Sequence, residues 1–269
     1  MNLPSPEEVE ASCDILYERG MSGCRIVGLE PGLVVKYGTQ VFESEAQSLS
    51  FVEANTNLPV PKLVRSYRHK NQTYIVMTRI PGKPLVESLS KMSVEEIKVI
   101  TSELKTMLDE LRALRITDFE SDSFIGSIGH GPCRDDIFRA GFESKGPFDT
   151  EEEMHENILE RWTNLFPTDP IPESEVQYYR RLYSENSGHQ IRFTHGDITS
   201  RNIMVENGHI SGIVDWGQAG WYPEYWAYIK SMAGSFDHWE TIWPLEVANF
   251  LQPYDFMRLI ELPIRSSFI

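Results

Sequence analysis

Two short apolar segments joined by a tight turn constrain the fold of this chain more than any other feature. Ile203–Val205 is a short apolar run, Asn207-Gly208 follows it, and a second apolar run occupies residues 210–214. Asn-Gly between apolar runs is a strong signal for a type I′ turn, because both residues tolerate a positive φ. The sequence therefore predicts a β-hairpin over residues 203–214.

Oxygen-bearing side chains flank this hairpin. Asn202 precedes the first strand, Asp215 follows the second, and Asp197 lies five positions before Asn202. A hairpin brings the residues at its open end side by side, so Asn202 and Asp215 could share a Mg²⁺ that takes its other ligands from phosphate and water. Asp197 could then orient and deprotonate an attacking hydroxyl, as phosphoryl transfer from a nucleotide requires. The alternative is a surface hairpin with ordinary polar flanks.

Composition indicates a globular protein of the cytoplasm. The 269 residues are 41% apolar and 11% aromatic, and no apolar run approaches the ~18 residues of a membrane span. The N-terminus lacks the basic and apolar regions of a leader. The three cysteines are widely spaced, which is typical of reduced thiols, and the seven histidines form no close metal-ligand pair. We expect no membrane association, no zinc site and, as the default, a monomer.

The charge distribution argues against a nucleic-acid partner. The net charge is −15, whereas proteins that bind a phosphate backbone need a basic face. The segment from Asp118 to Glu175 contains 15 acidic and 4 basic residues. This excess has two interpretations that the sequence leaves open: a field that concentrates a cationic substrate, or a solvated surface that keeps the protein soluble.

The pattern of elements predicts a β-rich first part and a mainly helical second part. Ser93 and Glu96 form a capping box that opens a long helix with an apolar face from Ile97 to Leu111. Thr150 with Glu153 marks another helix start. The expected strands are Arg25–Leu29, Leu33–Tyr37, Leu63–Tyr67 and Thr73–Met77, and the further expected helices are Glu43–Ala54 and Glu173–Asn186.

The motif around the hairpin resembles the catalytic core of the aminoglycoside phosphotransferase family, the small-molecule branch of the protein-kinase-like fold. The residues that carry the resemblance are HGDITSRNIMV from His195 and GIVDWGQAGWYPEYWAY ending at Tyr228, in a form especially similar to fungal members. The resemblance implies an α+β, bilobal fold, with an N-terminal nucleotide-binding lobe at residues 1–80, a C-terminal catalytic lobe at 81–269 and a hinge near 78–82. It also implies ATP as the phosphoryl donor, with GTP not excluded, and Mg²⁺.

Several nucleotide contacts follow from the same resemblance. Lys36 would contact the α- and β-phosphates and pair with Glu45 on the following helix, with Glu43 as the competing partner. An exposed edge-strand charge is the alternative for Lys36. Met77 would lie at the back of the adenine pocket, while the Thr78 carbonyl and the Ile80 amide would bind the base edge.

Other positions carry weaker signals. Gly20 and Gly23 could form a turn over the phosphates, but they lack a full glycine-rich fingerprint. His195 could act as a base, but the resemblance favours a structural place for it beside Asp197. Gly196 stands where protein kinases usually have an arginine that responds to phosphorylation, which suggests a catalytic loop that is always assembled.

The expected activity is transfer to a hydroxyl of a small molecule, with cationic molecules among the candidates. Two alternatives remain. A protein kinase is disfavoured because only a few residues separate Asp215 from Pro223-Glu224. An inactive binding protein is disfavoured because Lys36, Asp197 and Asn202 are all retained alongside Asp215.

The acceptor itself is not indicated by the sequence. Gly217 and Ala227 replace glutamates that are frequent in the fungal pattern, and we expect both changes to remove carboxylates near the acceptor. Gly126–Phe148 and Asp237–Ile269 are expected to shape the acceptor pocket. Four tryptophans could line this pocket or belong to the core: Trp216, Trp221, Trp239 and Trp243.

Overall fold

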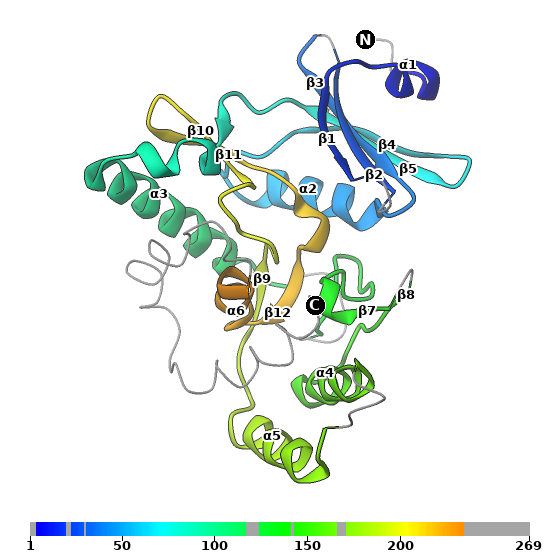
Figure 1. The fold of residues 1–269 in the computed structure, drawn as a ribbon, viewed down its shortest axis with the longest axis vertical. Helices are drawn as coiled ribbons and strands as arrows, with labels where there is room; N and C mark the ends of the chain where they lie inside the picture. Colours follow the sequence, from blue (N-terminus) through cyan, green and yellow to red (C-terminus); the bar gives the residue numbers. More distant parts are fainter. Residues whose placement is uncertain are drawn as a thin grey trace.

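A five-stranded antiparallel sheet forms the first part of the computed structural model, which describes residues 4–19, 23–29, 31–116, 124–140, 143–165 and 171–233 (Figure 1). The strand order is β1-β2-β3-β5-β4, and each neighbouring pair is antiparallel. The strands are β1 (Ile15–Arg19), β2 (Cys24–Leu29), β3 (Leu33–Gly38), β4 (Leu63–His69) and β5 (Gln72–Thr78).

Alternation of side chains along β3 and β5 gives this sheet two apolar faces. Val35 and Tyr74 belong to a cluster with Val9 of the short helix α1 (Pro6–Glu10), on one face. Val34 and Ile75, one position away on the same strands, belong to the main core with the helix α2 (Glu43–Asn55) on the other face. Figure 1 shows α2 lying against this side of the sheet, so the helix is placed between the sheet and the rest of the molecule.

Within the described residues, the second part contains the two longest helices and three small sheets. Its main helix is α3 (Val94–Ala113), followed by α4 (Glu151–Leu165), α5 (Glu173–Glu185) and α6 (Trp226–Ala233). The strands β6 (Lys83–Pro84), β10 (Ile203–Glu206) and β11 (His209–Ile213) form one sheet, β9 (Ile191–Thr194) pairs with β12 (Gly220–Pro223), and β7 (Arg139–Ala140) pairs with β8 (Glu143–Ser144). The 3₁₀ turns are η2 (Leu85–Glu87), η3 (Leu89–Lys91), η4 (Asp136–Phe138) and η5 (Trp216–Gln218).

The connection between the two parts is short. The strand β5 ends at Thr78, and β6 begins at Lys83 and pairs with β10 in the second part. Residues 79–82 therefore join the large sheet to the hairpin sheet. The division into lobes at residues 80 and 81 stays a prediction.

Most expected elements are present with boundaries within two residues of those predicted. The hairpin turn is confirmed, since Asn207 and Gly208 have φ of 52° and 82°. Neither β1 nor the pairing of β9 with β12, which joins segments far apart in the chain, was predicted from the sequence. Trp216 and Trp221 are core residues, whereas Trp239 and Trp243 lie outside the described residues, as does Asp237–Ile269. Among the described helices, none is both long and apolar enough to cross a membrane.

The capping box of α3 gives a first testable prediction. The Ser93 hydroxyl accepts a hydrogen bond from the Glu96 amide, and the Glu96 carboxylate accepts one from the Ser93 amide. We expect Ser93→Ala to lower the free energy of unfolding by about 1 kcal/mol. The Glu96 amide loses its acceptor, and the Glu96 carboxylate loses the hydroxyl that holds it beside the Ser93 amide. Urea titration measures this loss. Ser102→Ala, on the exposed side of the same helix, is the control and should not destabilise the protein.

Candidate active site

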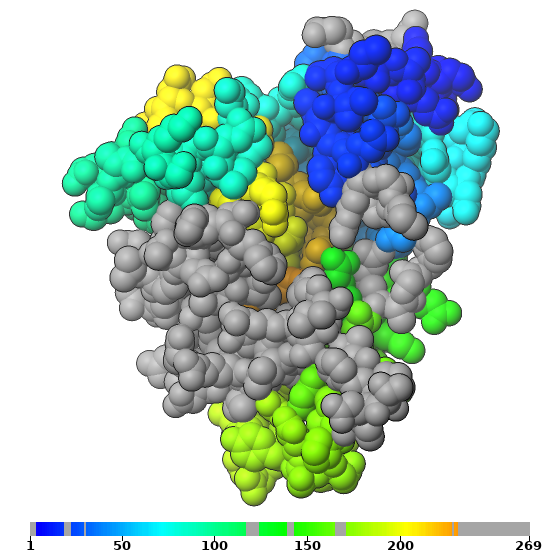
Figure 2. All heavy atoms as spheres, viewed as in Figure 1, coloured from blue at the N-terminus to red at the C-terminus, as the bar shows by residue number. Residues whose placement is uncertain are grey.

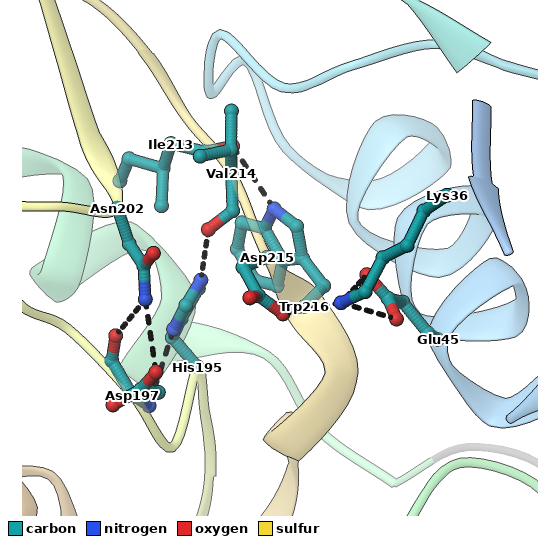
Figure 3. A network of polar contacts seen from close by, with 9 residues as sticks. All are labelled: Lys36, Glu45, His195, Asp197, Asn202, Ile213, Val214, Asp215 and Trp216. Atoms are coloured by element: carbon teal, nitrogen blue, oxygen red, sulfur yellow. Dashed lines mark hydrogen bonds and ion pairs between the residues drawn. The ribbon is translucent and has the colours of Figure 1, made fainter. Parts of the chain in front are cut away.

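A buried lysine joins the large sheet, α2 and the end of the hairpin (Figure 3). Lys36 Nζ on β3 lies 2.9 Å from both carboxylate oxygens of Glu45 on α2, and 2.7 Å from Asp215 Oδ1. Glu45 is therefore the partner of Lys36, as predicted. Glu43 is exposed and instead accepts a hydrogen bond from the Ser66 hydroxyl. The edge-strand alternative for Lys36 is wrong, because β3 lies in the middle of the sheet and Lys36 is buried.

Charge coupling within this cluster decides its protonation. Burial opposes the charge on Lys36, but the attraction of Asp215 and Glu45 outweighs it and raises the pKa of Lys36. The surrounding protein desolvates Asp215, yet contact with Lys36 holds the pKa of Asp215 below its ordinary value. Burial, with repulsion from Asp215, raises the pKa of Glu45. A protonated lysine beside an ionised Asp215 is thus the stable state of the cluster.

The hairpin brings Asn202 and Asp215 to one end, as the sequence analysis predicted. Ile203 pairs with Ile213, and the Val214 amide donates to the Asn202 carbonyl at 2.9 Å, one residue before Asp215. Asp215 itself has a φ of 64°, a left-handed conformation that few non-glycine residues adopt. Such strained positions concentrate at functional sites, because the surrounding structure must hold them in place.

Asp197 lies in the loop that follows β9, and Asn202 fixes its geometry. The Asn202 Nδ2 group donates to the Asp197 carbonyl at 2.8 Å and to Asp197 Oδ2 at 2.9 Å. These bonds leave the amide oxygen of Asn202 available as a metal ligand. Burial raises the pKa of Asp197 to about 6, against the attraction of Lys230 and the hydrogen bond from Asn202.

His195 connects the Asp197 loop to the end of the hairpin. Its Nδ1 accepts a hydrogen bond from the Asp197 amide at 3.2 Å, and its Nε2 lies 3.0 Å from the Val214 carbonyl (Figure 3). Burial lowers the pKa of His195 to about 4, so the ring is neutral near pH 7 and Nε2 carries the proton that Val214 accepts. Both ring nitrogens are used to position backbone, which supports the structural place expected for His195.

The residues expected to hold an adenine base lie at the end of β5 and just beyond it. Met77 is buried and pairs with Val34 and Leu63 on the two neighbouring strands. Thr78 ends β5, and its hydroxyl accepts a hydrogen bond from the Lys62 amide at 2.9 Å. The half-buried Ile80 packs against Gly212 of β11. Gly23 has a φ of 61°, while Gly20 lies outside the described residues.

A match to a known family accompanies this geometry. The phosphotransferase enzyme family matches residues 38–248 of the chain. This chain belongs to the phosphotransferase enzyme family. The matched residues include Glu45, Asp197, Asn202 and Asp215, and cover more than half of the sequence. The chain is therefore an enzyme, a small-molecule phosphotransferase.

Individual relatives agree with this assignment. An aminoglycoside 3′-phosphotransferase of Escherichia coli is 25% identical over 215 residues, which are 77% of this chain and 71% of the relative. Clavilactone A biosynthesis cluster protein Y of Ampulloclitocybe clavipes is 25% identical over 199 residues, which are 66% of this chain and 49% of that protein. A ternary complex of aminoglycoside phosphotransferase APH(4)-Ia with ADP and hygromycin B superposes with a TM-score of 0.66 at 15% identity, covering 96% of this chain and 86% of that one. These likenesses confirm the α+β bilobal kinase-like fold.

The segment that follows Asp215 is short, whereas a protein kinase has a long activation loop there. After Asp215 the chain enters η5 and then β12, which pairs with β9, so this short segment is already part of a sheet.

A Cβ on Gly217 would lie 3.2 Å from Glu45 Oε2 and 3.6 Å from Lys36 Nζ. Position 217 therefore lies beside the Lys36 cluster.

The glycine before Asp197 gives a second prediction. Gly196 has a φ of 79°, and a Cβ on it would lie 2.3 Å from the Gln218 carbonyl oxygen. Gly196→Ala should lower the free energy of unfolding through both backbone strain and this clash. Gly188 is a matched control, with a φ of 88° and no atom within 4 Å of an added Cβ. Gly188→Ala should cost only the strain, about 1–2 kcal/mol. Urea titrations compare the two, and equal losses would contradict the clash.

The sequence analysis missed two site residues, Lys230 and Asp135. Lys230 Nζ lies 2.9 Å from Asp135 Oδ1. Burial raises the pKa of Asp197, and the positive charge of Lys230 is the main effect that lowers it. The two residues are 95 positions apart, so no local pattern links them. Asp135 does lie within Gly126–Phe148, the segment assigned to the acceptor pocket. Among the described residues, no group of three or more histidine, cysteine or acidic side chains could hold a metal ion.

Proposed function

We propose that this enzyme transfers the γ-phosphoryl group of ATP, with Mg²⁺, to a hydroxyl group of a small molecule. The observation that carries the proposal is the joining of two clusters by His195: Lys36 with Asp215 on one side, and Asp197 with Asn202 on the other. The first cluster suits nucleotide phosphates and a metal ion. The second suits an incoming hydroxyl.

The donor atoms at the hairpin end fit Mg²⁺. Asn202 offers an amide oxygen, and the Asp215 side chain keeps 39% of its exposure, with one oxygen engaged by Lys36. Mg²⁺ prefers one or two protein oxygens and takes its other ligands from phosphate and water. When bound, the ion would neutralise negative charge on the phosphates. Lys36 would steady the α- and β-phosphates, with Glu45 fixing its position.

Asp197 would perform the proton transfer. The acceptor hydroxyl would give its proton to Asp197 while its oxygen forms a bond to the γ-phosphorus and the bond from that phosphorus to the bridging oxygen breaks, which leaves ADP. Its raised pKa, about 6, lies near physiological pH, where a general base is most effective. Catalysis would otherwise rest on positioning and on charge stabilisation.

The base of the nucleotide would lie beside Met77, with the Thr78 carbonyl and the Ile80 amide at its edge. This assignment rests on the family resemblance and on the place of these residues, where β5 leaves the large sheet beside the hairpin. ATP is the proposed donor, and GTP is the alternative. Competition between the two nucleotides, measured by displacement of a fluorescent ATP analogue, decides between them.

The acceptor class is a hydroxylated small molecule. The names of related proteins include aminoglycoside phosphotransferases and a biosynthesis-cluster protein, which supports either an amino sugar or a hydroxylated metabolite. The acidic helix α4 lies beside α5 toward the end of the molecule opposite the large sheet (Figure 1), and the yellow-green atoms of α5 form that end in Figure 2. Its Glu151 accepts hydrogen bonds from His189, and its Glu156 binds Arg180. This placement favours a solvated surface over substrate steering for the acidic residues of α4.

A cytoplasmic location remains part of the proposal. All three cysteines are free thiols, with Cys133 buried and Cys13 exposed, which suits a reducing compartment.

A mass-spectrometric screen tests the proposed function. The purified enzyme is incubated with Mg-ATP and a pool of aminoglycosides, amino alcohols, sugars and hydroxylated metabolites. The expected result is a product heavier by one phosphoryl group, absent with Asp197→Asn. Tight nucleotide binding without any phosphorylated product would instead support the inactive binding protein. A parallel reaction contains a protein substrate such as casein, and phosphorylation of that protein would support a protein kinase.

A further inference from the structure

Asp135 is a buried carboxylate with three hydrogen-bond donors around it. Its side chain is 0% exposed. Oδ1 accepts from the Ile137 amide at 3.0 Å and from Lys230 Nζ at 2.9 Å, and Oδ2 accepts from Trp226 Nε1 at 3.0 Å. The carboxylate thus ties the start of η4 to the helix α6.

Two residues of α6, Trp226 and Lys230, each donate to a different oxygen of this carboxylate. Trp226 and Lys230 are four residues apart, so they lie one turn apart on the same side of the helix. Trp226 stacks on Tyr222 of β12, with 5.3 Å between the ring centroids and an interplanar angle of 9°. β12 pairs with β9, the strand that leads into Asp197, and Figure 1 shows α6 beside these two strands. The position of Lys230 is therefore fixed relative to the catalytic loop.

Burying this ion pair is energetically expensive, since both side chains leave water almost completely. Lys230 retains only 5% of its side-chain exposure. Ion pairs buried in this way often stabilise a protein no better than apolar residues of the same volume would. Burial opposes the charge on Lys230, but Asp135 and then Asp197 outweigh it and raise the pKa of Lys230. The ammonium therefore acts on Asp197 as well as on its partner.

The charges around the reaction centre divide into two similar groups. On the nucleotide side, Lys36 lies between Glu45 and Asp215. On the other side, Lys230 binds Asp135 and is attracted to Asp197. Each buried lysine thus serves two carboxylates. Lys36 is already bound by its own two partners, so among the described residues Lys230 supplies the positive charge of the second group.

The geometry points to Lys230 as a positioning residue for the reaction: held by Asp135 and Trp226, it places a fixed positive charge beside Asp197, where the acceptor hydroxyl approaches. This inference rests on the proposed function. Lys230 stays protonated and exchanges no proton. Its charge orients the Asp197 carboxylate toward the hydroxyl and so supports the proton transfer. The nucleotide, bound by the Lys36 group, should not depend on it.

Two variants separate the charge of Lys230 from the ion pair. Asp135→Asn breaks the ion pair but keeps the Lys230 side chain, whose charge Asp197 still favours, and the amide oxygen can still accept from Trp226 or Ile137. The double variant Lys230→Met/Asp135→Asn also breaks the pair but removes the ammonium, without leaving a buried carboxylate unpaired. A purely structural pair predicts equal rates for both. Glu156→Gln/Arg180→Met, which removes the ion pair between α4 and α5, is the control and should leave the rate unchanged.

The kinetics are measured with an acceptor from the screen above, alongside Mg-ATP binding and thermal unfolding. We expect the double variant to have a kcat at least about tenfold below that of Asp135→Asn, with the same affinity for Mg-ATP. The effect should be smaller than the about 10²–10³-fold of a donor that touches the transition state, since Lys230 acts through Asp197. Equal kcat values in the two variants, or equal loss of nucleotide affinity and kcat, would overturn the role of Lys230 alone. Absence of transfer by the unmodified enzyme would overturn the proposed function and this inference with it.

Discussion

Asp197→Asn is expected to lower turnover by about 10²–10⁴-fold, the usual cost of losing a general base, while Mg-ATP affinity stays nearly unchanged. The substitution keeps the shape of the side chain, so position 197 can still accept the hydrogen bond from Asn202 Nδ2 that the structure shows at 2.9 Å. It removes the negative charge of the side chain and with it the ability to take a proton. Steady-state kinetics with an acceptor that the unmodified enzyme phosphorylates, and calorimetric titration with Mg-ATP, measure the two quantities.

The stability of the same variant separates lost chemistry from a damaged fold. The pKa of Asp197 is raised from 3.8 to about 6 in the folded state, so the folded protein binds this proton more tightly than the unfolded chain. Stability therefore falls as pH rises through this window, and the cost of the buried charge is fully present above pH 6. Asp197→Asn carries no such charge. We expect it to be at least as stable as the unmodified enzyme at pH 7, and less active.

A carboxylate away from the site provides the comparison. Asp109→Asn on α3 removes a 45% exposed group that pairs with Lys105, and it should leave turnover unchanged. Near-normal turnover of Asp197→Asn would remove Asp197 from the proposed mechanism. A parallel loss of stability and of nucleotide binding would show instead that the residue maintains the fold of the loop.

The parts of this site that could be predicted are those with local causes. The hairpin follows from Asn207-Gly208, whose backbone conformations only a few residue types accept, and its open end then brings Asn202 and Asp215 together. The start of α3 follows from two side chains three residues apart. The pairing of Lys36 with Glu45 spans nine residues and could be inferred from the family resemblance.

The parts that could not be predicted depend on packing between distant segments. Asp135 and Lys230 become partners only because α6 packs on β12, whose Tyr222 and the helix residue Trp226 stack together. Neither residue stands out by spacing, since an aspartate in a loop and a lysine in a helix are ordinary surface residues in most sequences. The contacts of Gly217 could not be predicted for the same reason. Its neighbours Glu45 and Lys36 come from the other end of the chain.

Asp215→Asn should weaken Mg-ATP binding by about 10- to 100-fold, which corresponds to the loss of one charge-assisted interaction of about 1.5–3 kcal/mol. Asparagine accepts the left-handed backbone at this position almost as readily as aspartate, so the φ of 64° should persist. The variant loses negative charge next to Lys36 Nζ and loses the carboxylate proposed to hold Mg²⁺. It should therefore shift the dependence of nucleotide binding on Mg²⁺ toward higher concentrations of the ion.

Glu45→Gln distinguishes the metal role of Asp215 from its contact with Lys36. Both carboxylates lie within 3 Å of Lys36 Nζ, but only Asp215 lies at the hairpin end with Asn202. Nucleotide affinity is measured for both variants across a series of Mg²⁺ concentrations. Glu45→Gln should reduce the affinity by a similar factor at every concentration, because it loosens Lys36 alone. If the nucleotide affinity of both variants depends on Mg²⁺ in the same way, Asp215 is a partner of Lys36 and not a metal ligand.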